Sequence, residues 1–385
     1  RFSKLSVGVA ILMIVLAAGL LAAQNQKAES APRLLTVDDY FNIRAVGDPQ
    51  VSPDGKWVAY TVTTEDLEKD ESMTRIWMVP TAGGDPIPMT AKDKSASRPR
   101  WSPDGRYLAF LSAPEEGKDQ VWTLFRQGGE AVQLTDTAQD VSEYEWSPDG
   151  KRMVLVLQDP TPEELAVKKG EEKKKTQPPW VITRRQFKQD YIGYLDSRRT
   201  HLYVLDVETK KATQITSGDF DDSEPRWSPD GKHIAFTSNR TADPDSNYNT
   251  DIWVVAADNT DMGRELIQIT TNPGPDGSPA WSPDGKTIAH VSATDTDAML
   301  YATNHLAVIS EGDEAAVLTA DLDRMVSTPR FSSDGKWIFF GLEDSGEQIL
   351  ARIPAAGGAV ERIVAGRHVV QAFTPEVAGV IATLI

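Results

Sequence analysis

One short motif recurs six times along the chain, and this repetition constrains the fold more than any other feature. The full form of the motif is Trp-Ser-Pro-Asp-Gly-Lys, and its serines are Ser52, Ser102, Ser147, Ser228, Ser282 and Ser332. The steps between consecutive serines are 50, 45, 81, 54 and 50 residues. The chain is therefore built from repeats of about 50 residues, and the third repeat carries an insertion of about 30 residues.

Each copy of the motif predicts a tight turn followed by strands. Proline suits the second position of a type I turn, and glycine supplies the positive φ that closes it. A strand follows the turn, as in Trp57–Tyr60, then a second strand, as in Ile76–Val79, and then a third that ends in an apolar residue and a threonine, as in Met89–Thr90. Each repeat is therefore expected to form a small antiparallel sheet with apolar residues on both faces.

A sheet of this size cannot bury two apolar faces alone, and packing such sheets around an axis solves the problem. The sequence therefore predicts an all-β fold, a β-propeller. The segments Phe373–Pro375 and Val380–Ala382 look like a seventh, degenerate copy, because Thr374 lies 42 residues after Ser332. We expect seven blades, with the last one truncated at Ile385 and an unpaired strand edge left open there.

The N-terminal segment has the pattern of a secretory signal. Arg1 and Lys4 precede an apolar run over residues 7–23, and a polar stretch over residues 24–30 follows. We expect residues 1–31 to be a signal peptide or signal anchor, residues 32–385 to form the propeller, and the protein to be periplasmic or secreted. The run is 17 residues long, near the lower limit for spanning a bilayer, so anchoring in a membrane by residues 7–23 is the alternative.

Composition and motif searches exclude several kinds of chemistry. The formal charge of 40 − 57 = −17 disfavours nucleic acid as a partner. The absence of cysteine excludes thiol catalysis, cysteine-ligated metal and disulfides. The chain lacks a G-x-S-x-G turn, an H-E-x-x-H motif, a Walker loop and a G-x-G-x-x-G motif. We therefore expect no catalytic residue, no metal site and no cofactor within these 385 residues.

Two other polar patterns are better explained by structure than by metal binding. The five histidines are scattered along the repeats, and strand or loop positions account for them better than a metal site does. The alternating acidic and amide residues from Asp243 to Asp251 resemble a calcium loop but lack its glycine and its final glutamate. An acidic surface loop is the expectation for this segment.

The insertion, at about residues 161–200, differs in charge from the rest of the chain. It holds ten Lys or Arg and six Asp or Glu, a net charge of +4 in a chain of −17. We expect its first half to be a mobile solvated loop and its second half, which mixes aromatic and charged residues, to be ordered. Two interpretations stay open for the insertion. It either binds substrate or contacts another domain, or it is a surface loop without such a role. The candidate residues for such a role are Arg184, Arg185, Lys188, Asp190, Tyr191 and Tyr194.

Three segments together resemble the propeller of the prolyl oligopeptidase family, in its acylaminoacyl-peptidase and dipeptidyl-peptidase branch. They are the repeated turn motif, the stretch from Ile182 to Leu195 that leads into His201–Asp206, and the stretch from Leu318 to Arg324. The last of these adds Asp323 and Arg324 to the candidate contact residues.

The resemblance implies that this chain is part of a longer protein whose domains have different functions. In this family a propeller precedes an α/β-hydrolase domain with a Ser, Asp and His triad, and the ring limits access to peptides. Peptide substrates and the protein's own downstream hydrolase domain would then be the partners. The chain itself would be the non-catalytic, gating portion of an exported serine peptidase.

Two other classes of protein stay open at this point. A TolB-like periplasmic propeller would have six blades, would usually follow a small α/β domain, and would bind proteins without catalysis. Only the segment Thr36–Asp48 separates the signal from the first motif, which is too short for such a domain. A free-standing scaffold or sugar-binding propeller is the third class, and it requires a closed ring.

Overall fold

The computed structural model describes residues 33–114, 117–168, 179–190, 192–298, 301–310 and 312–385. The chain divides into two units, residues 1–43 and residues 44–385. The described part of the first unit contains one short helix, α2 (Val37–Tyr40). The expected signal over residues 1–31, including the run at 7–23, lies outside the described residues. Within the described ranges, no helix is both long enough and apolar enough to span a membrane.

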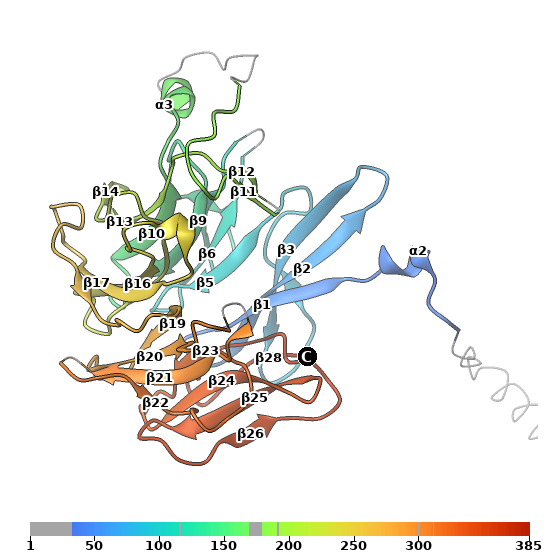
Figure 1. The fold of residues 1–385 in the computed structure, drawn as a ribbon. Helices are drawn as coiled ribbons and strands as arrows, with labels where there is room; N and C mark the ends of the chain where they lie inside the picture. The colour runs from blue at the N-terminus through green and yellow to red at the C-terminus, as the bar shows by residue number, and fades with distance from the viewer. Residues whose placement is uncertain (1–32, 115–116, 169–178, 191, 299–300, 311) are drawn as a thin grey trace, which may run out of the picture. The chain divides into compact units, whose positions relative to one another are not determined.

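The described residues of the second unit form six four-stranded antiparallel sheets, each built from one continuous stretch of chain and called here blades 1 to 6. The expected β-propeller is therefore confirmed, whereas the three strands named for each repeat become four (Figure 1). The additional strand precedes each turn motif and is the first strand of its blade. The strands of blades 1 to 3 are β1 (Ala45–Val51), β2 (Trp57–Asp66), β3 (Glu71–Pro80), β4 (Ile87–Pro88); β5 (Ser97–Trp101), β6 (Tyr107–Ser112), β7 (Gln120–Phe125), β8 (Val132–Gln133); β9 (Val141–Trp146), β10 (Arg152–Gln158), β13 (Thr200–Asp206), β14 (Ala212–Gln214).

Blades 4 to 6 repeat this order without a long insertion. Their strands are β15 (Asp222–Trp227), β16 (His233–Ser238), β17 (Asp251–Ala256), β18 (Ile267–Gln268); β19 (Asp276–Trp281), β20 (Thr287–Ser292), β21 (His305–Ser310), β22 (Ala316–Val317); β23 (Val326–Phe331), β24 (Trp337–Asp344), β25 (Glu347–Pro354), β26 (Glu361–Val364). A 3-10 helix, η1 (Pro244–Ser246), lies between β16 and β17. The first strands of neighbouring blades contact one another, for example β15 with β19 and β19 with β23.

The hydrophobic core lies between the blades rather than in a single centre. One cluster joins blades 1 and 2 around Met78 and Phe110, and another joins blades 3 and 4 around Leu202 and Phe236. Similar clusters lie between the other neighbouring pairs. Burial on both sides explains why the second strands are apolar at nearly every position.

The turn motif forms the hairpin between the first and second strands of each blade. In blade 1 the Ser52 hydroxyl donates to Asp54 Oδ1 at 2.6 Å and accepts from the Trp57 amide at 3.0 Å. Gly55 has a φ of 68°, the left-handed conformation that glycine adopts at little cost. The same hydroxyl-to-carboxylate bond occurs at all six copies of the motif.

The turns also pack against one another from blade to blade. A methyl group placed on Gly105 would lie 3.4 Å from Cδ of Pro53, and one on Gly335 would lie 3.4 Å from Cδ of Pro283. The motif thus uses its glycine for the turn and for close contact with the preceding blade.

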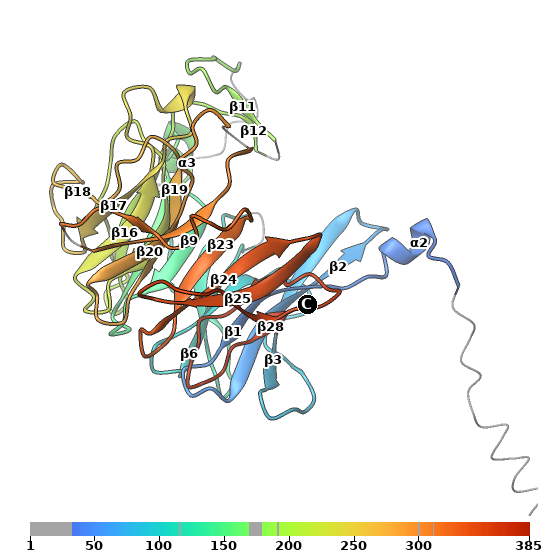
Figure 2. The same cartoon turned by 60° about the horizontal axis from the view of Figure 1, so that its bottom comes forward.

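A two-stranded hairpin, β27 (Ala372–Phe373) and β28 (Thr383–Leu384), follows blade 6. It packs on blade 6 and contacts β1, so it lies between blades 6 and 1 (Figure 2). The Thr374 hydroxyl accepts from the Ala382 amide at 3.0 Å, as the motif serines accept from the second strand. The structure therefore contains six four-stranded blades and one hairpin with the bonding of the repeated turn.

Candidate functional site

The long insertion and the candidate residues lie on one side of the blades. We call the side with the six motif turns the turn face. The opposite side, with the loops between second and third strands and between blades, is the insertion face. The insertion leaves β10 after Gln158 and returns at Thr200 in β13, so it belongs to the insertion face. The loop that holds Asp323 and the end of β24 at Asp344 belong to the same face.

The described part of the insertion has regular structure in both halves. Helix α3 (Pro162–Lys168) opens the first half, where a solvated loop was expected. Thr161 Oγ1 accepts from the Glu164 amide at 3.0 Å, and Glu164 Oε2 accepts from the Thr161 amide at 2.8 Å. This reciprocal capping, with proline at the first helical position, explains the helix. The second half contains a short hairpin of β11 (Lys188–Gln189) and β12 (Gly193–Tyr194).

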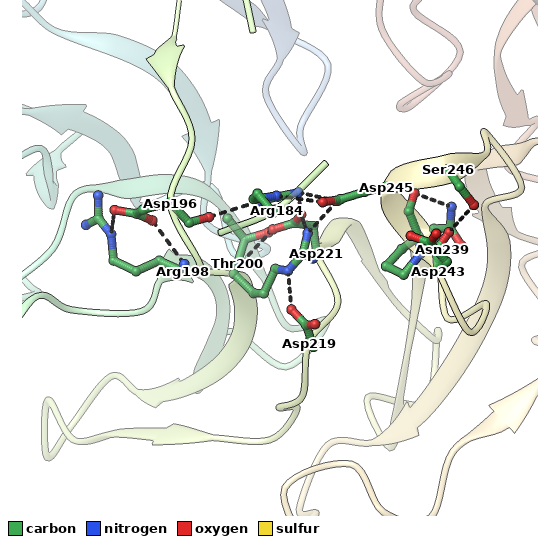
Figure 3. A network of polar contacts seen from close by, with 12 residues as sticks. Arg184, Asp196, Arg198, Thr200, Asp219, Asp221, Asn239, Asp243, Asp245 and Ser246 are labelled. Atoms are coloured by element: carbon green, nitrogen blue, oxygen red, sulfur yellow. Dashed lines mark hydrogen bonds and ion pairs between the residues drawn. The ribbon is translucent and has the colours of Figure 1, made fainter. Parts of the chain in front are cut away.

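An arginine of the insertion is fixed to blade 4. Arg184 donates from Nε and Nη2 to the two carboxylate oxygens of Asp245, at 3.0 and 2.7 Å (Figure 3). The two side chains are only 12% and 8% exposed. Arg184 lowers the pKa of Asp245 below its usual value through this hydrogen-bonded pair. The bidentate geometry makes the contact both strong and directional.

A second arginine extends this contact between blades 3 and 4. Arg199 donates from Nε to Asp219 at 2.7 Å and from Nη1 to Asp221 at 2.9 Å (Figure 3). Its Nη1 also lies 3.5 Å from Asp245 Oδ1, so Asp245 contacts both arginines. We call Arg184, Arg199, Asp219, Asp221 and Asp245 the arginine clasp. The clasp holds the insertion against the loops of blade 4.

The insertion also exposes a group of large apolar side chains. The rings of Trp180 and Tyr194 lie 5.4 Å apart between centroids. The exposed apolar residues of this surface, called here the apolar patch, are Trp180, Val181, Ile182, Phe187, Ile192 and Tyr194. Apolar side chains gathered on a surface in this way are typical of a binding surface.

The candidate residues of the insertion therefore have different environments. Arg184 is held in the clasp, whereas Arg185 is exposed and lies 3.5 Å from Asp243. Lys188 and Asp190 are exposed beside the apolar patch, and Tyr194 belongs to it. Tyr191 lies outside the described residues.

The other two candidates, Asp323 and Arg324, lie in the connection between blades 5 and 6. Arg324 donates from Nε to Asp344 Oδ1 at 2.7 Å, and Asp323 is exposed. Both line a cavity of about 600 Å³ together with Tyr301 and Asp344. Among the described residues, no hydrogen bond or ion pair joins these two to the insertion.

Sequence reasoning missed three members of the clasp, Arg199, Asp219 and Asp221, and misread a fourth. Asp245 was assigned to an acidic surface loop, but its carboxylate is buried in the pair with Arg184. The alternating acids from Asp243 onwards were a usable signal, because an acidic run and a basic insertion in one acidic chain suggest mutual pairing. The partner of each acid depends on how blades 3 and 4 meet, which spacing alone does not give.

The described ranges contain no group of three or more His, Cys, Asp or Glu arranged to hold a metal ion. Two histidines are buried at strand positions, His201 near Asp222 and His290 near Asp276. The insertion face offers paired charges and exposed apolar side chains.

Comparison with known proteins gives relatives among peptidases. The chain is 33% identical over 223 residues to the uncharacterized peptidase YuxL of Bacillus subtilis, covering 58% of this chain and 34% of that protein. It is 28% identical over 360 residues to dipeptidyl-peptidase 5 of Porphyromonas gingivalis, covering 87% of this chain and 50% of the relative. The chain therefore spans about a third to a half of these relatives. No family model matches the sequence.

Solved structures with the same fold include a peptidase and an isolated propeller. Acylaminoacyl peptidase of Pyrococcus horikoshii superposes with a TM-score of 0.68 at 18% identity, over 87% of this chain and 48% of that chain. The propeller domain of the trilobed protease of Pyrococcus furiosus superposes with a TM-score of 0.59 at 18% identity, over 86% and 87% of the two chains. The resemblance drawn from the sequence is thus confirmed: this chain is similar to the propeller portion of peptidases of the prolyl oligopeptidase family.

Proposed function

We propose that the chain is the propeller portion of an exported serine peptidase. The likeness to dipeptidyl-peptidase 5 over 87% of this chain, which is 50% of that protein, is the observation that carries this proposal. The chemistry would belong to an α/β-hydrolase domain outside these residues. There a serine would attack the peptide carbonyl with histidine as general base, and backbone amides would hold the oxyanion. The substrates would be peptides, or the N-terminal acyl-aminoacyl or dipeptidyl groups of peptides.

In this proposal the propeller controls access to the hydrolase domain from the insertion face. The direction of β28, antiparallel to β27, supports this arrangement, because the chain runs from the turn at Thr374 back towards that face. Any segment that follows Ile385 would leave on the same side as the insertion. The apolar patch, with the exposed cations of Arg185 and Lys188 beside it, would contact either the substrate or the hydrolase domain.

We also propose that the β27–β28 hairpin is the first half of a seventh blade. Its contacts with blade 6 and with β1 and its repeat-like hydrogen bonds support this interpretation. The free edge of β28 would then pair with strands supplied by a later part of the protein. The signal-like pattern at residues 7–23 supports export, either with cleavage or with retention as a membrane anchor.

Labelling of the complete gene product by a fluorophosphonate probe tests the catalytic part of this proposal. The complete protein should react covalently with the probe and should release dye from dipeptidyl or acyl-aminoacyl substrates. Residues 32–385 expressed alone should do neither, and they serve as the matched control. A complete gene product that neither reacts nor hydrolyses would contradict the proposal and would favour a TolB-like protein-binding propeller.

A further inference from the structure

Three blades place an arginine at the same position of their first strand. Arg100, Arg226 and Arg330 each precede the Trp or Phe that opens the turn motif, in blades 2, 4 and 6. In all three, Nη1 donates to the carbonyl of the proline just before, at 2.7, 2.8 and 2.8 Å respectively. The shared bond gives the three side chains the same orientation relative to their strands. First strands contact one another around the centre of the blades, and the charges of Arg226 and Arg100 act on Arg330, so the three side chains approach one another there.

Within the described part of the chain, one of the three arginines forms an ion pair with a carboxylate. Arg100 donates to both oxygens of Asp48 in blade 1, at 2.8 and 2.9 Å. Among the ion pairs of the described residues, none within 4.0 Å involves Arg226 or Arg330, although both are at least half-buried. A guanidinium has five N–H donors, and the proline carbonyl uses one of them. Most donors of Arg226 and Arg330 are therefore not bonded to protein.

The nearby carboxylates already have other partners. Glu224 accepts from the Ser278 amide at 2.7 Å and from the Thr237 hydroxyl at 2.9 Å. Glu145 accepts from the Trp227 amide at 3.1 Å. Burial raises the pKa of Glu145, and Arg226 opposes this rise. Neither carboxylate thus neutralises the two free guanidiniums by direct pairing.

Two unpaired cations near one another in a half-buried space are unfavourable. The effect is visible at Arg330, where burial and then the charge of Arg226 lower the pKa to about 9, against the attraction of Glu145. An oxyanion between the two guanidiniums would relieve this repulsion. Arginine offers the paired N–H groups that bind carboxylate or phosphate oxygens in a bidentate manner.

We propose that Arg226 and Arg330 form an oxyanion-binding site at the centre of the blades. The ligand is a carboxylate or an inorganic oxyanion such as phosphate. The C-terminal carboxylate of a peptide and free phosphate share this chemistry. The site needs no hydrolase domain, so the proposal stands or falls independently of the proposed peptidase function.

Calorimetric titration of residues 32–385 tests the site and separates the two sources of ligand. The probes are inorganic phosphate, trialanine with a free C-terminal carboxylate, and trialanine amide. Binding of phosphate or of the free peptide, but not of the amide, is the expected result. A preference for the free peptide would identify the peptide C-terminus as the source, and a preference for phosphate would identify the inorganic ion. Absence of binding by both anionic probes would overturn the proposal.

Variants distinguish a binding site from a purely structural cluster. R226Q and R330Q should each weaken binding about tenfold or more, because each removes a charged, bidentate donor. E145Q should instead tighten binding several-fold, since it removes the competing negative charge. A purely structural role would make E145Q destabilising without any gain in anion affinity. R352Q is the matched control, because Arg352 pairs with Glu361 on the outer part of blade 6.

Two further outcomes are decisive. If R330Q does not fold, R330K keeps the charge without the paired N–H groups and should bind more weakly than the parent protein. Unchanged affinity in R226Q and in the folded Arg330 variant would contradict the proposal, as would an equal loss in R352Q.

Discussion

In several blades, the hydroxyl of a threonine just after the fourth strand is hydrogen-bonded to the third strand. The threonine that follows the apolar residue accepts from a third-strand amide in five blades, as Thr216 Oγ1 does from the Leu202 amide at 2.9 Å. The apolar–Thr pair was recognised from the sequence as the end of a strand. Its role as a hydrogen-bond acceptor was not, because the partner amide lies 14 residues away in the chain.

Replacing Thr216 by valine should lower the free energy of unfolding by about 1 to 3 kcal/mol. The substitution keeps the shape of the side chain but leaves the buried Leu202 amide without its acceptor. Urea denaturation of the variant measures the effect. Thr213→Val, at an exposed position of β14 just before Thr216, is the control and should change stability little. Equal effects of the two substitutions would contradict this role of the hydroxyl.

Asp251 should make stability depend on pH in the acid range. Burial raises its pKa to about 6, with a smaller contribution from the nearby charge of Asp276. The folded state therefore favours the protonated carboxyl more than the unfolded state does, so its contribution to stability is complete below about pH 4 and is lost as pH rises to about 6.

The variant Asp251→Asn removes this loss. Relative to the parent protein, its stability should rise by up to about 3 kcal/mol between pH 4 and pH 7. Thermal unfolding across this range measures the difference. Asp258→Asn, an exposed carboxylate, should show no such trend. A flat difference for Asp251→Asn would contradict a raised pKa.

At the scale of elements, the sequence predicted the parts whose structure is local. The motif turns, the second strands and the third strands follow from turn chemistry and strand-forming residues. Helix α3 was missed although its capping signal, Thr161 followed by Pro162 and Glu164, was present in the sequence. The high charge of the surrounding segment favoured a loop. The clasp could not be predicted, because Arg184 and Asp245 are brought together by the packing of two blades.

Breaking the clasp should loosen the insertion. Arg184→Gln leaves the buried carboxylate of Asp245 with the more distant Arg199 as its remaining charged partner, and should cost about 1 to 3 kcal/mol. Limited proteolysis should then cut within residues 179–199 faster than in the parent protein. Arg185→Gln is the matched control, because that side chain is exposed, and it should leave the rate unchanged. Equal rates in both variants would exclude an anchoring role for Arg184.

At the scale of the whole molecule, repetition was the decisive information. The recurrence of one turn motif about every 50 residues predicted a propeller, because sheets with two apolar faces need neighbours on both sides. The position of the β27–β28 hairpin beside β1 depends on how the ends of the array meet. The central arginines also escaped notice, because the other three repeats have a different residue at this position, namely Gln50, Glu145 and Ala280.

The hairpin should stabilise the array through its apolar contacts with blade 6. Phe373 and Ile381 pack against Phe339 and Leu350. Phe373→Ala should therefore lower the free energy of unfolding by about 2 kcal/mol. Ile385→Ala, at an exposed position, should have little effect in the same denaturation experiment. A neutral Phe373→Ala would mean that the hairpin does not contribute to the stability of the blades.

The nucleotide sequence beyond the codon for Ile385 shows whether a hydrolase domain follows the propeller. A serine peptidase of the proposed kind requires an open reading frame that continues for about 300 residues, the size of a further domain. That segment should contain a G-x-S-x-G turn followed by an aspartate and a histidine. A stop codon within about 40 residues, less than one repeat of this chain, would contradict the proposed peptidase. It would leave a propeller without a hydrolase domain.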